Sequence, residues 1–168
     1  MTESHDLKNR AWQLAYEFEA KYGGCAQCVL AALKETIGGI PEEVFKSATG
    51  LAGGIGLQGY ACGALTGGVL ALSSYLGREY SNFADPQRVR FQTARMCEKL
   101  IGKFTAEYGS PNCAAIQTKL MDRSYRLSVP EDLADFLAAG GHDDKCTSVC
   151  GNSARWVIEI LEEEGLLK

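Results

Sequence analysis

Apolar residues recur at every third or fourth position along most of this chain, and that spacing limits the fold more than any other feature of the sequence. Residues spaced in this way share one face of an α-helix, whereas a half-buried β-strand needs strict alternation of apolar and polar residues. No segment combines sustained alternation with an enrichment in β-branched residues. We therefore expect an all-α protein, with about six to eight helices in a single compact domain spanning residues 1–168.

Glycine pairs, prolines and capping residues mark where the helices should begin and end. Gly23-Gly24 separates the first two helices, and Gly38-Gly39 ends the second. Asp85-Pro86 is typical of the start of a long helix, which Gly109 ends. The predicted helices cover residues 7–22, 25–37, 41 to about 48 or 50, 65–76, 86–108, 113 to about 121, 130–139 and about 149–164.

Eight glycines between residues 50 and 68 predict a glycine-rich loop followed by a central helix. Residues 54–59 spell GxGxxG, but a dinucleotide-binding motif needs a strand before it and a helix after it. Because a helix precedes this segment, we expect no NAD site. Residues 47–77 carry no charge and are long enough to cross a bilayer, yet glycines and polar residues interrupt them. This favours a buried central helix, packed closely through Gly63 and Gly67, over a membrane span.

The charge balance argues against two classes of partner. The chain has 17 basic and 21 acidic residues, a formal net charge of −4. A mildly acidic protein has no long-range field that attracts a phosphate backbone or anionic lipids, so we expect neither nucleic-acid nor membrane-surface binding. The first residues are polar and lack the apolar stretch of a secretory signal, which favours a cytoplasmic location.

Seven cysteines are the most informative part of the composition. In a chain without signs of export, so many cysteines indicate metal binding or redox chemistry rather than a disulfide scaffold. Cys97 lies in the middle of the long helix beside Met96 and Leu100, so we interpret it as a core thiol. His5 and His142 have no spacing that supports a role as ligands. Neither follows a CxxC motif, so no covalently attached haem is expected.

The other six cysteines lie at or near expected helix starts, where free amides and the helix dipole lower the pKa of a thiol. Gly59 and Gly63 flank one of them, allow close backbone approach to whatever its sulfur binds, and are predicted to contact a cofactor. No acid–base or nucleophile constellation indicates a named enzymatic reaction. The six candidate redox or metal-binding residues are Cys25 and Cys28 in a CxxC, Cys62 after the glycine-rich loop, Cys113 after Asn112, and Cys146 and Cys150 four residues apart.

These residues resemble a family of redox-active proteins named for its CGCAxxGCC pattern. Cys62-Gly63-Ala64-Leu65-Thr66-Gly67 matches the CGAxxG segment of that family. Gly24-Cys25-Ala26-Gln27 matches its first cysteine, which favours Cys25 over Cys28. Cys113, in a Gly-Ser-x-x-Cys context, and Cys150, before the closing helix, match the later cysteines, although Cys146 competes with Cys150. The resemblance extends over residues 12–164.

The resemblance implies an all-helical fold and a role in redox chemistry. The same module is similar to the part of split-Soret cytochromes that is assigned an iron–sulfur centre, so such a centre becomes an expectation for this chain. Those cytochromes attach haem through CxxCH, which this chain lacks. Haem-based electron transfer is therefore not implied.

We expect a redox protein in which four thiolates converge on an iron–sulfur cluster for electron transfer. One alternative is a metal-free thiol–disulfide protein that uses Cys25/Cys28 or Cys146/Cys150. Another is a structural zinc site, formed by the same two pairs, in a module that only binds a partner. The sequence does not define the redox partner, and it leaves a homodimer open.

Overall fold

Eight α-helices make up the computed structural model, which describes residues 2–167 and confirms the all-α expectation. Between residues 2 and 167 the backbone forms no β-strand, only an isolated bridge between Ala61 and Asn112. The α-helices are α1 (Thr2–Tyr22), α2 (Cys25–Ile37), α3 (Glu42–Ser47), α4 (Gly63–Tyr75), α5 (Val89–Tyr108), α6 (Cys113–Met121), α7 (Pro130–Ala138) and α8 (Cys146–Glu163). Two 3₁₀-helices, η1 (Ala48–Leu51) and η2 (Tyr80–Asn82), and a π-helix, η3 (Gly141–Lys145), lie between them.

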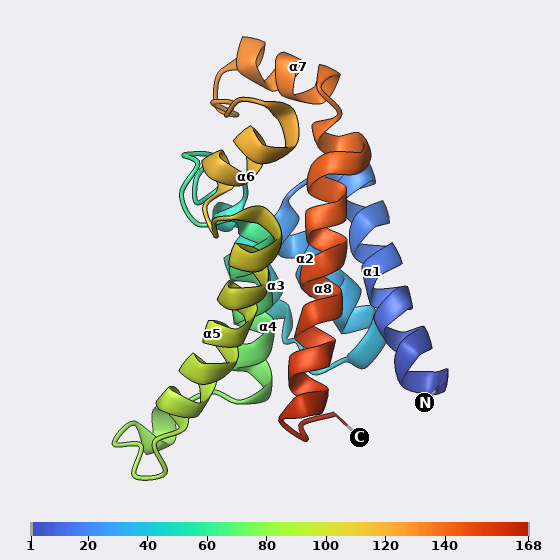
Figure 1. Ribbon diagram of the computed structural model, residues 1–168. Coiled ribbons are helices and arrows are strands. Elements are labelled where there is room, and N and C mark those ends of the chain that lie inside the picture. The colour runs from blue at the N-terminus through green and yellow to red at the C-terminus, as the bar shows by residue number, and fades with distance from the viewer. Residues whose placement is uncertain (1, 168) are drawn as a thin grey trace.

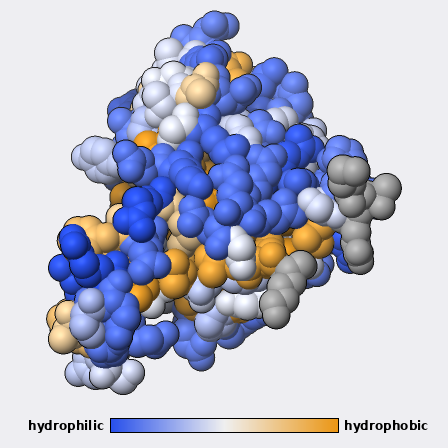
Figure 2. All heavy atoms as spheres, turned by 60° about the horizontal axis from the view of Figure 1, so that its bottom comes forward, coloured by the Kyte–Doolittle hydropathy of each residue, from blue (hydrophilic) through white to orange (hydrophobic). Residues whose placement is uncertain are grey.

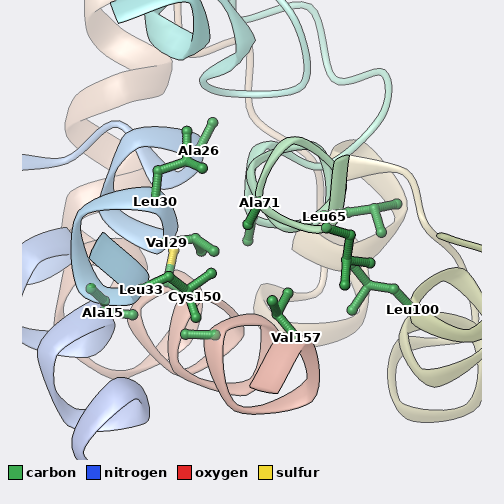
Figure 3. Packing of buried hydrophobic residues seen from close by; sticks show 14 of the residues in the cluster. Ala15, Ala26, Val29, Leu30, Leu33, Leu65, Ala71, Leu100, Cys150 and Val157 are labelled. Carbon is green, nitrogen blue, oxygen red and sulfur yellow. The ribbon is translucent and has the colours of Figure 1, made fainter. Parts of the chain in front are cut away.

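Five helices, α1, α2, α4, α5 and α8, surround the main hydrophobic core. α1 runs antiparallel along α8, and α4 packs between α2 and α5 (Figure 1). Val29 and Leu33 of α2 lie in the centre of the core with Ala71 of α4 and Val157 of α8 (Figure 3). Val29, Leu33 and Val157 belong to the apolar faces that the helical spacing predicts.

The two ends of the bundle differ. α6, α7 and the loop of residues 52–61 lie at the end where α4 and α8 begin, at the top of Figure 1. There, the end of α6 and α7 pack on a second, smaller core formed by Met121, Tyr125 and Phe136. The opposite end presents a mostly hydrophilic surface with a band of apolar residues across it (Figure 2).

The central helix packs closely because it carries glycines where it meets its neighbours. A Cβ atom at Gly67 would lie 2.5 Å from the carbonyl oxygen of Ala26 and 2.9 Å from its Cα. A Cβ at Gly68 would lie 2.7 Å from a methyl group of Leu100. α4 is therefore the buried, glycine-packed helix that the uncharged stretch predicted. No helix between residues 2 and 167 is long and apolar enough to cross a membrane.

Three helix starts differ by three residues or more from the sequence-based expectation. α1 begins at Thr2, five residues before the predicted start at Leu7. α5 begins at Val89, after the turn that Arg88 completes with a φ of 56°. Asp85 still caps it from a distance, because its carboxylate accepts the amides of Val89 at 2.6 Å and Arg90 at 3.2 Å. α8 begins at Cys146, three residues before the predicted Val149, because the π-helix η3 runs directly into it.

The GxGxxG segment has no strand–turn–helix context. Residues 52–60 follow η1 as a series of turns, with positive φ at Gly54 (74°), Gly56 (60°) and Gly59 (80°). These glycines therefore serve a tight loop, as the absence of a preceding strand predicted.

Gly67 and Gly102 form a matched pair for testing the packing of α4. We expect Gly67→Ala to lower the free energy of unfolding by about 1–3 kcal/mol, because the new methyl group meets the backbone of α2. Gly102→Ala, in an exposed turn of α5 with no atom within 4 Å of the new methyl, should instead stabilise by about 0.5–1 kcal/mol. Urea denaturation of both variants measures the difference. Equal effects would show that α2 and α4 do not approach as closely as described.

Candidate functional site

Four cysteines line one cavity of about 180 Å³ at the end of the bundle covered by α6 and α7. Each stands at the start of a different α-helix. Cys25, Cys113 and Cys146 are the first residues of α2, α6 and α8, and Cys62 directly precedes α4. The structure thus brings together helix starts that are up to 121 positions apart in the sequence (146 − 25).

Paired backbone segments hold Cys62 and Cys113 beside each other. The amide of Cys113 donates to the carbonyl of Tyr60 at 2.7 Å, and the amide of Cys62 donates to the carbonyl of Pro111 at 2.9 Å. The bridge between Ala61 and Asn112 lies between these two hydrogen bonds. Backbone hydrogen bonds alone therefore hold the starts of α4 and α6 next to each other.

Glycines make room for the cysteines. A Cβ at Gly63 would overlap the sulfur of Cys25, so only glycine allows this sulfur to lie against the start of α4. A Cβ at Gly54 would lie 2.7 Å from the Cβ of Cys113. Gly59, with a φ of 80°, packs against Ala114 of α6. Gly59 and Gly63 do not line the cavity, so their predicted contact with a cofactor stays a prediction.

Cys28 and Cys150 lie beside the cavity but do not line it. The thiol of Cys28 donates to the carbonyl of Gly23 at 3.1 Å, and the thiol of Cys150 points to the carbonyl of Cys25 at 3.8 Å. Each close pair of cysteines is thus divided, with Cys25 and Cys146 on the cavity and their neighbours behind it. The resemblance favours Cys25 over Cys28 and Cys150 over Cys146, whereas the cavity is lined by Cys25 and Cys146.

Cys97 lies elsewhere, in the middle of α5. It is half-buried, packs against the main core and does not line the cavity. This position matches the interpretation of Cys97 as a packing residue.

Burial dominates the electrostatics of the thiols. It raises the pKa of Cys62 to about 12 and that of Cys113 to about 12, and it also raises the pKa of Cys25, Cys146 and Cys150. The expectation that helix starts lower these values was wrong, because loss of hydration outweighs the nearby amides. The backbone amides near Cys62 still lower the pKa of its thiol, as expected for a helix start.

Local amides and an amide side chain favour negative charge on two of the sulfurs. The backbones of Ala64 and Leu65 favour the thiolate of Cys62. The buried side chain of Gln117 donates its Nε2 to the sulfur of Cys113 at 3.5 Å. Its Oε1 accepts the amide of Tyr125 at 2.8 Å, which fixes the orientation of the side-chain amide.

Glu19 is the functional candidate that the sequence analysis missed. Its side chain lines the cavity, is only 2% exposed, and contributes one carboxylate oxygen, Oε2, that has no hydrogen-bond partner among the described residues. Burial raises its pKa to about 7, and its negative charge would raise the pKa of all six candidate cysteines. A signal was present, because Glu19 continues the buried row of Ala11 and Ala15 at spacings of four.

His142 also reaches the site, although no spacing suggested it. It lines the cavity, and its Nε2 lies 3.5 Å from Oε1 of Glu19. His5, in contrast, is exposed in the first turns of α1 and does not line the cavity.

The cavity surrounds its thiols with apolar side chains. Leu57, Leu127, Leu133 and Phe136 line it together with the cysteines. Among the side chains of residues 4–167, no three of His, Cys, Asp or Glu converge closely enough to hold a single metal ion.

Comparison with known proteins gives one family and one relative. Residues 23–160 match the model of a family described as "Putative redox-active protein (C_GCAxxG_C_C)". A protein of Archaeoglobus fulgidus, described as an uncharacterized protein, is 30% identical over 124 residues, which cover 71% of this chain and 80% of that protein. No solved structure gives a significant match.

The raised pKa of Glu19 predicts a pH dependence of stability in the metal-free protein. The unfolded chain releases this proton near pH 4.5, whereas the folded chain keeps it until about pH 7. The free energy of unfolding should therefore fall by roughly 3 kcal/mol as the pH rises through this window, and Glu19→Gln should remove that fall. Urea denaturation between pH 4 and 8 measures it.

The matched control is Glu17→Gln, an exposed site on the same helix, which should follow the wild-type curve. If the free energy of unfolding depends on pH in the same way in Glu19→Gln and in the wild type, Glu19 does not keep its proton in the folded state.

Proposed function

This chain belongs to the C_GCAxxG_C_C family of redox-active proteins, and from that premise we propose that its cavity binds an iron–sulfur cluster that serves in electron transfer. The ligands would be the four cavity-lining cysteines, Cys25, Cys62, Cys113 and Cys146. The observation that carries the proposal is their placement, four thiols from four helix starts around one cavity.

The donor set fits an iron–sulfur cluster. Sets of thiolates select iron–sulfur clusters or zinc among the common metal centres. The space left by glycine at position 63, which the Cys25 sulfur occupies, and the amides that act on Cys62 fit the close backbone approach and sulfur hydrogen bonding typical of cluster sites. When bound, such a cluster supplies a one-electron carrier.

The size of the cavity supports a cluster over zinc. A single zinc ion needs four ligand atoms at about 2.0–2.3 Å from one point, whereas a cluster distributes its thiolate ligands over several metal atoms. A cavity of about 180 Å³ between the four cysteines gives room for such a centre.

The protein's own groups would support a negatively charged centre. Four helix N-termini direct their partial positive charge to the cavity. Apolar side chains such as Leu57 and Phe136 limit the access of water. Because burial keeps the thiols protonated, metal binding has to release protons, so uptake should become tighter as the pH rises.

One observation supports the metal-free alternative. Cys62 and Cys113 directly follow the paired residues Ala61 and Asn112, so their segments lie side by side. A reversible disulfide between these two residues would be a different use of the same site.

Anaerobic reconstitution with ferrous iron and sulfide tests the proposal. The wild-type protein should bind both and gain the visible absorption of a cluster. Cys62→Ser should lower the bound iron roughly tenfold or more, since it removes a ligand. Cys97→Ser, outside the cavity, should keep the iron and cost only about 1 kcal/mol of stability. Zinc bound in place of iron, or a folded protein that binds no metal and forms a Cys62–Cys113 disulfide, would contradict the cluster.

Only one cysteine of the CxxC motif, Cys25, lines the cavity, and this difference gives a second, independent test. We expect Cys25→Ser to lose bound iron and Cys28→Ser to keep it, because only Cys25 lines the cavity. Iron analysis of the two purified variants, with circular dichroism to verify folding, measures this. The reverse pattern would mean that Cys28 is the ligand and that α2 starts in a different orientation.

A further inference from the structure

Glu19 lies between the cavity and His142, whose side chain is partly exposed to solvent. One oxygen of its carboxyl group, Oε2, has no hydrogen-bond partner among the described residues, and the group lies in the cavity wall. The other oxygen, Oε1, lies 3.5 Å from Nε2 of His142. The His142 side chain is 32% exposed, so the two groups form a continuous line from cavity to surface.

The fold keeps His142 in this place. Its ring packs edge-on against Phe136, with ring centroids 5.3 Å apart. Gly23, with a φ of 64°, leaves the space next to the ring, because a Cβ there would lie 3.2 Å from Cε1 of His142. His142 belongs to the π-helix η3, an element that occurs frequently at functional sites.

The groups around Glu19 come from every element packed against it. Cys25 and Cys28 face it from α2, and Cys146 and Cys150 face it from α8. Cys62 and Cys113 interact with it across the cavity. From η3 comes His142, whose pKa is lowered by burial against the opposing charge of Asp143. An electron added within this ring of groups is therefore added close to a carboxyl group.

We propose that Glu19 and His142 form a proton path, so that electron transfer in the cavity is coupled to the uptake of one proton from solvent. This inference rests on the proposed iron–sulfur function. When a one-electron reductant adds a negative charge to the cavity, one proton passes from solvent through His142 to the Glu19 carboxylate, which becomes a neutral carboxylic acid. Removal of the electron returns the carboxylate and releases the proton by the same route.

Charge in the buried cavity then stays constant, which avoids the large cost of an uncompensated buried charge.

Redox titration of the reconstituted full-length protein tests the path. Between pH 5.5 and 8.5, the wild-type midpoint potential should fall as the pH rises, approaching about 59 mV per pH unit, the equivalent of a tenfold change for one electron. Glu19→Gln cannot take up a proton and should give a potential that does not change with pH. Glu17→Gln, exposed on the same helix, should keep the wild-type slope. A wild-type potential that is independent of pH, or a Glu19→Gln slope equal to that of the wild type, would overturn the inference.

Two further measurements do not depend on the folding of Glu19→Gln. The infrared difference spectrum of the wild-type protein should show a carboxylic acid band that appears on reduction, and its absence would contradict the path. His142→Phe keeps Glu19 but removes the exchangeable proton, so it should slow reduction in stopped-flow experiments and leave the slope of the potential unchanged. An unchanged rate would exclude His142 from the path. Failure of the wild type to bind iron would overturn the proposed function itself, which distinguishes the two failures.

Discussion

The close packing of α2 against α4 is the contact on which the rest of the structure depends. Gly67 lets α4 approach the backbone of α2 at Ala26, and Gly63, one turn earlier, leaves the space that the Cys25 sulfur occupies. A side chain at either glycine would push the two helices apart, together with their first residues. Because those helix starts bring Cys25 and Cys62 to the cavity, the contact that fills the core also assembles part of the site. Stability of the fold and geometry of the site are therefore properties of one interface.

The cavity sets two electrostatic effects against each other. Helix N-termini favour thiolates, as they do in exposed reactive cysteines, but burial favours neutral thiols. Burial is the stronger effect here, since the pKa of Cys62 is raised to about 12 although the amides of Ala64 and Leu65 favour its thiolate. Glu19 acts in the same direction as burial, because its negative charge opposes ionisation of the surrounding thiols. Without metal, the cavity thus holds weak nucleophiles that a bound cation would convert into thiolate ligands.

Local sequence signals predicted the helices and the position of the cysteines at their starts, because apolar spacing, glycine pairs and caps are all short-range. They could not decide between Cys25 and Cys28, which are one helical turn apart and differ only in how α2 is rotated against α4 and α8. The start of α8 was misplaced because η3 feeds directly into it, and a π-helix has no clear sequence signature. The burial of Glu19 could be predicted from its place in the row of Ala11 and Ala15, but its role could not, because that role comes from the helices packed around it. In each case the missing information was tertiary.

The small core beneath α7 has a consequence for how the cavity exchanges with its surroundings. Leu133 and Phe136 of α7 line the cavity, and Phe136 packs in the small core with Met121 and Tyr125 and edge-on against His142 of η3. Proteins open in cooperative units whose cost follows the number of buried contacts that each unit loses. Detaching α7 exposes few apolar side chains, whereas separating α1 from α8 would disrupt the main core. Local opening of α7 would therefore cost fewer buried contacts than separating the bundle helices, and it would uncover the cavity while the helices that present Cys25, Cys62 and Cys146 remain folded.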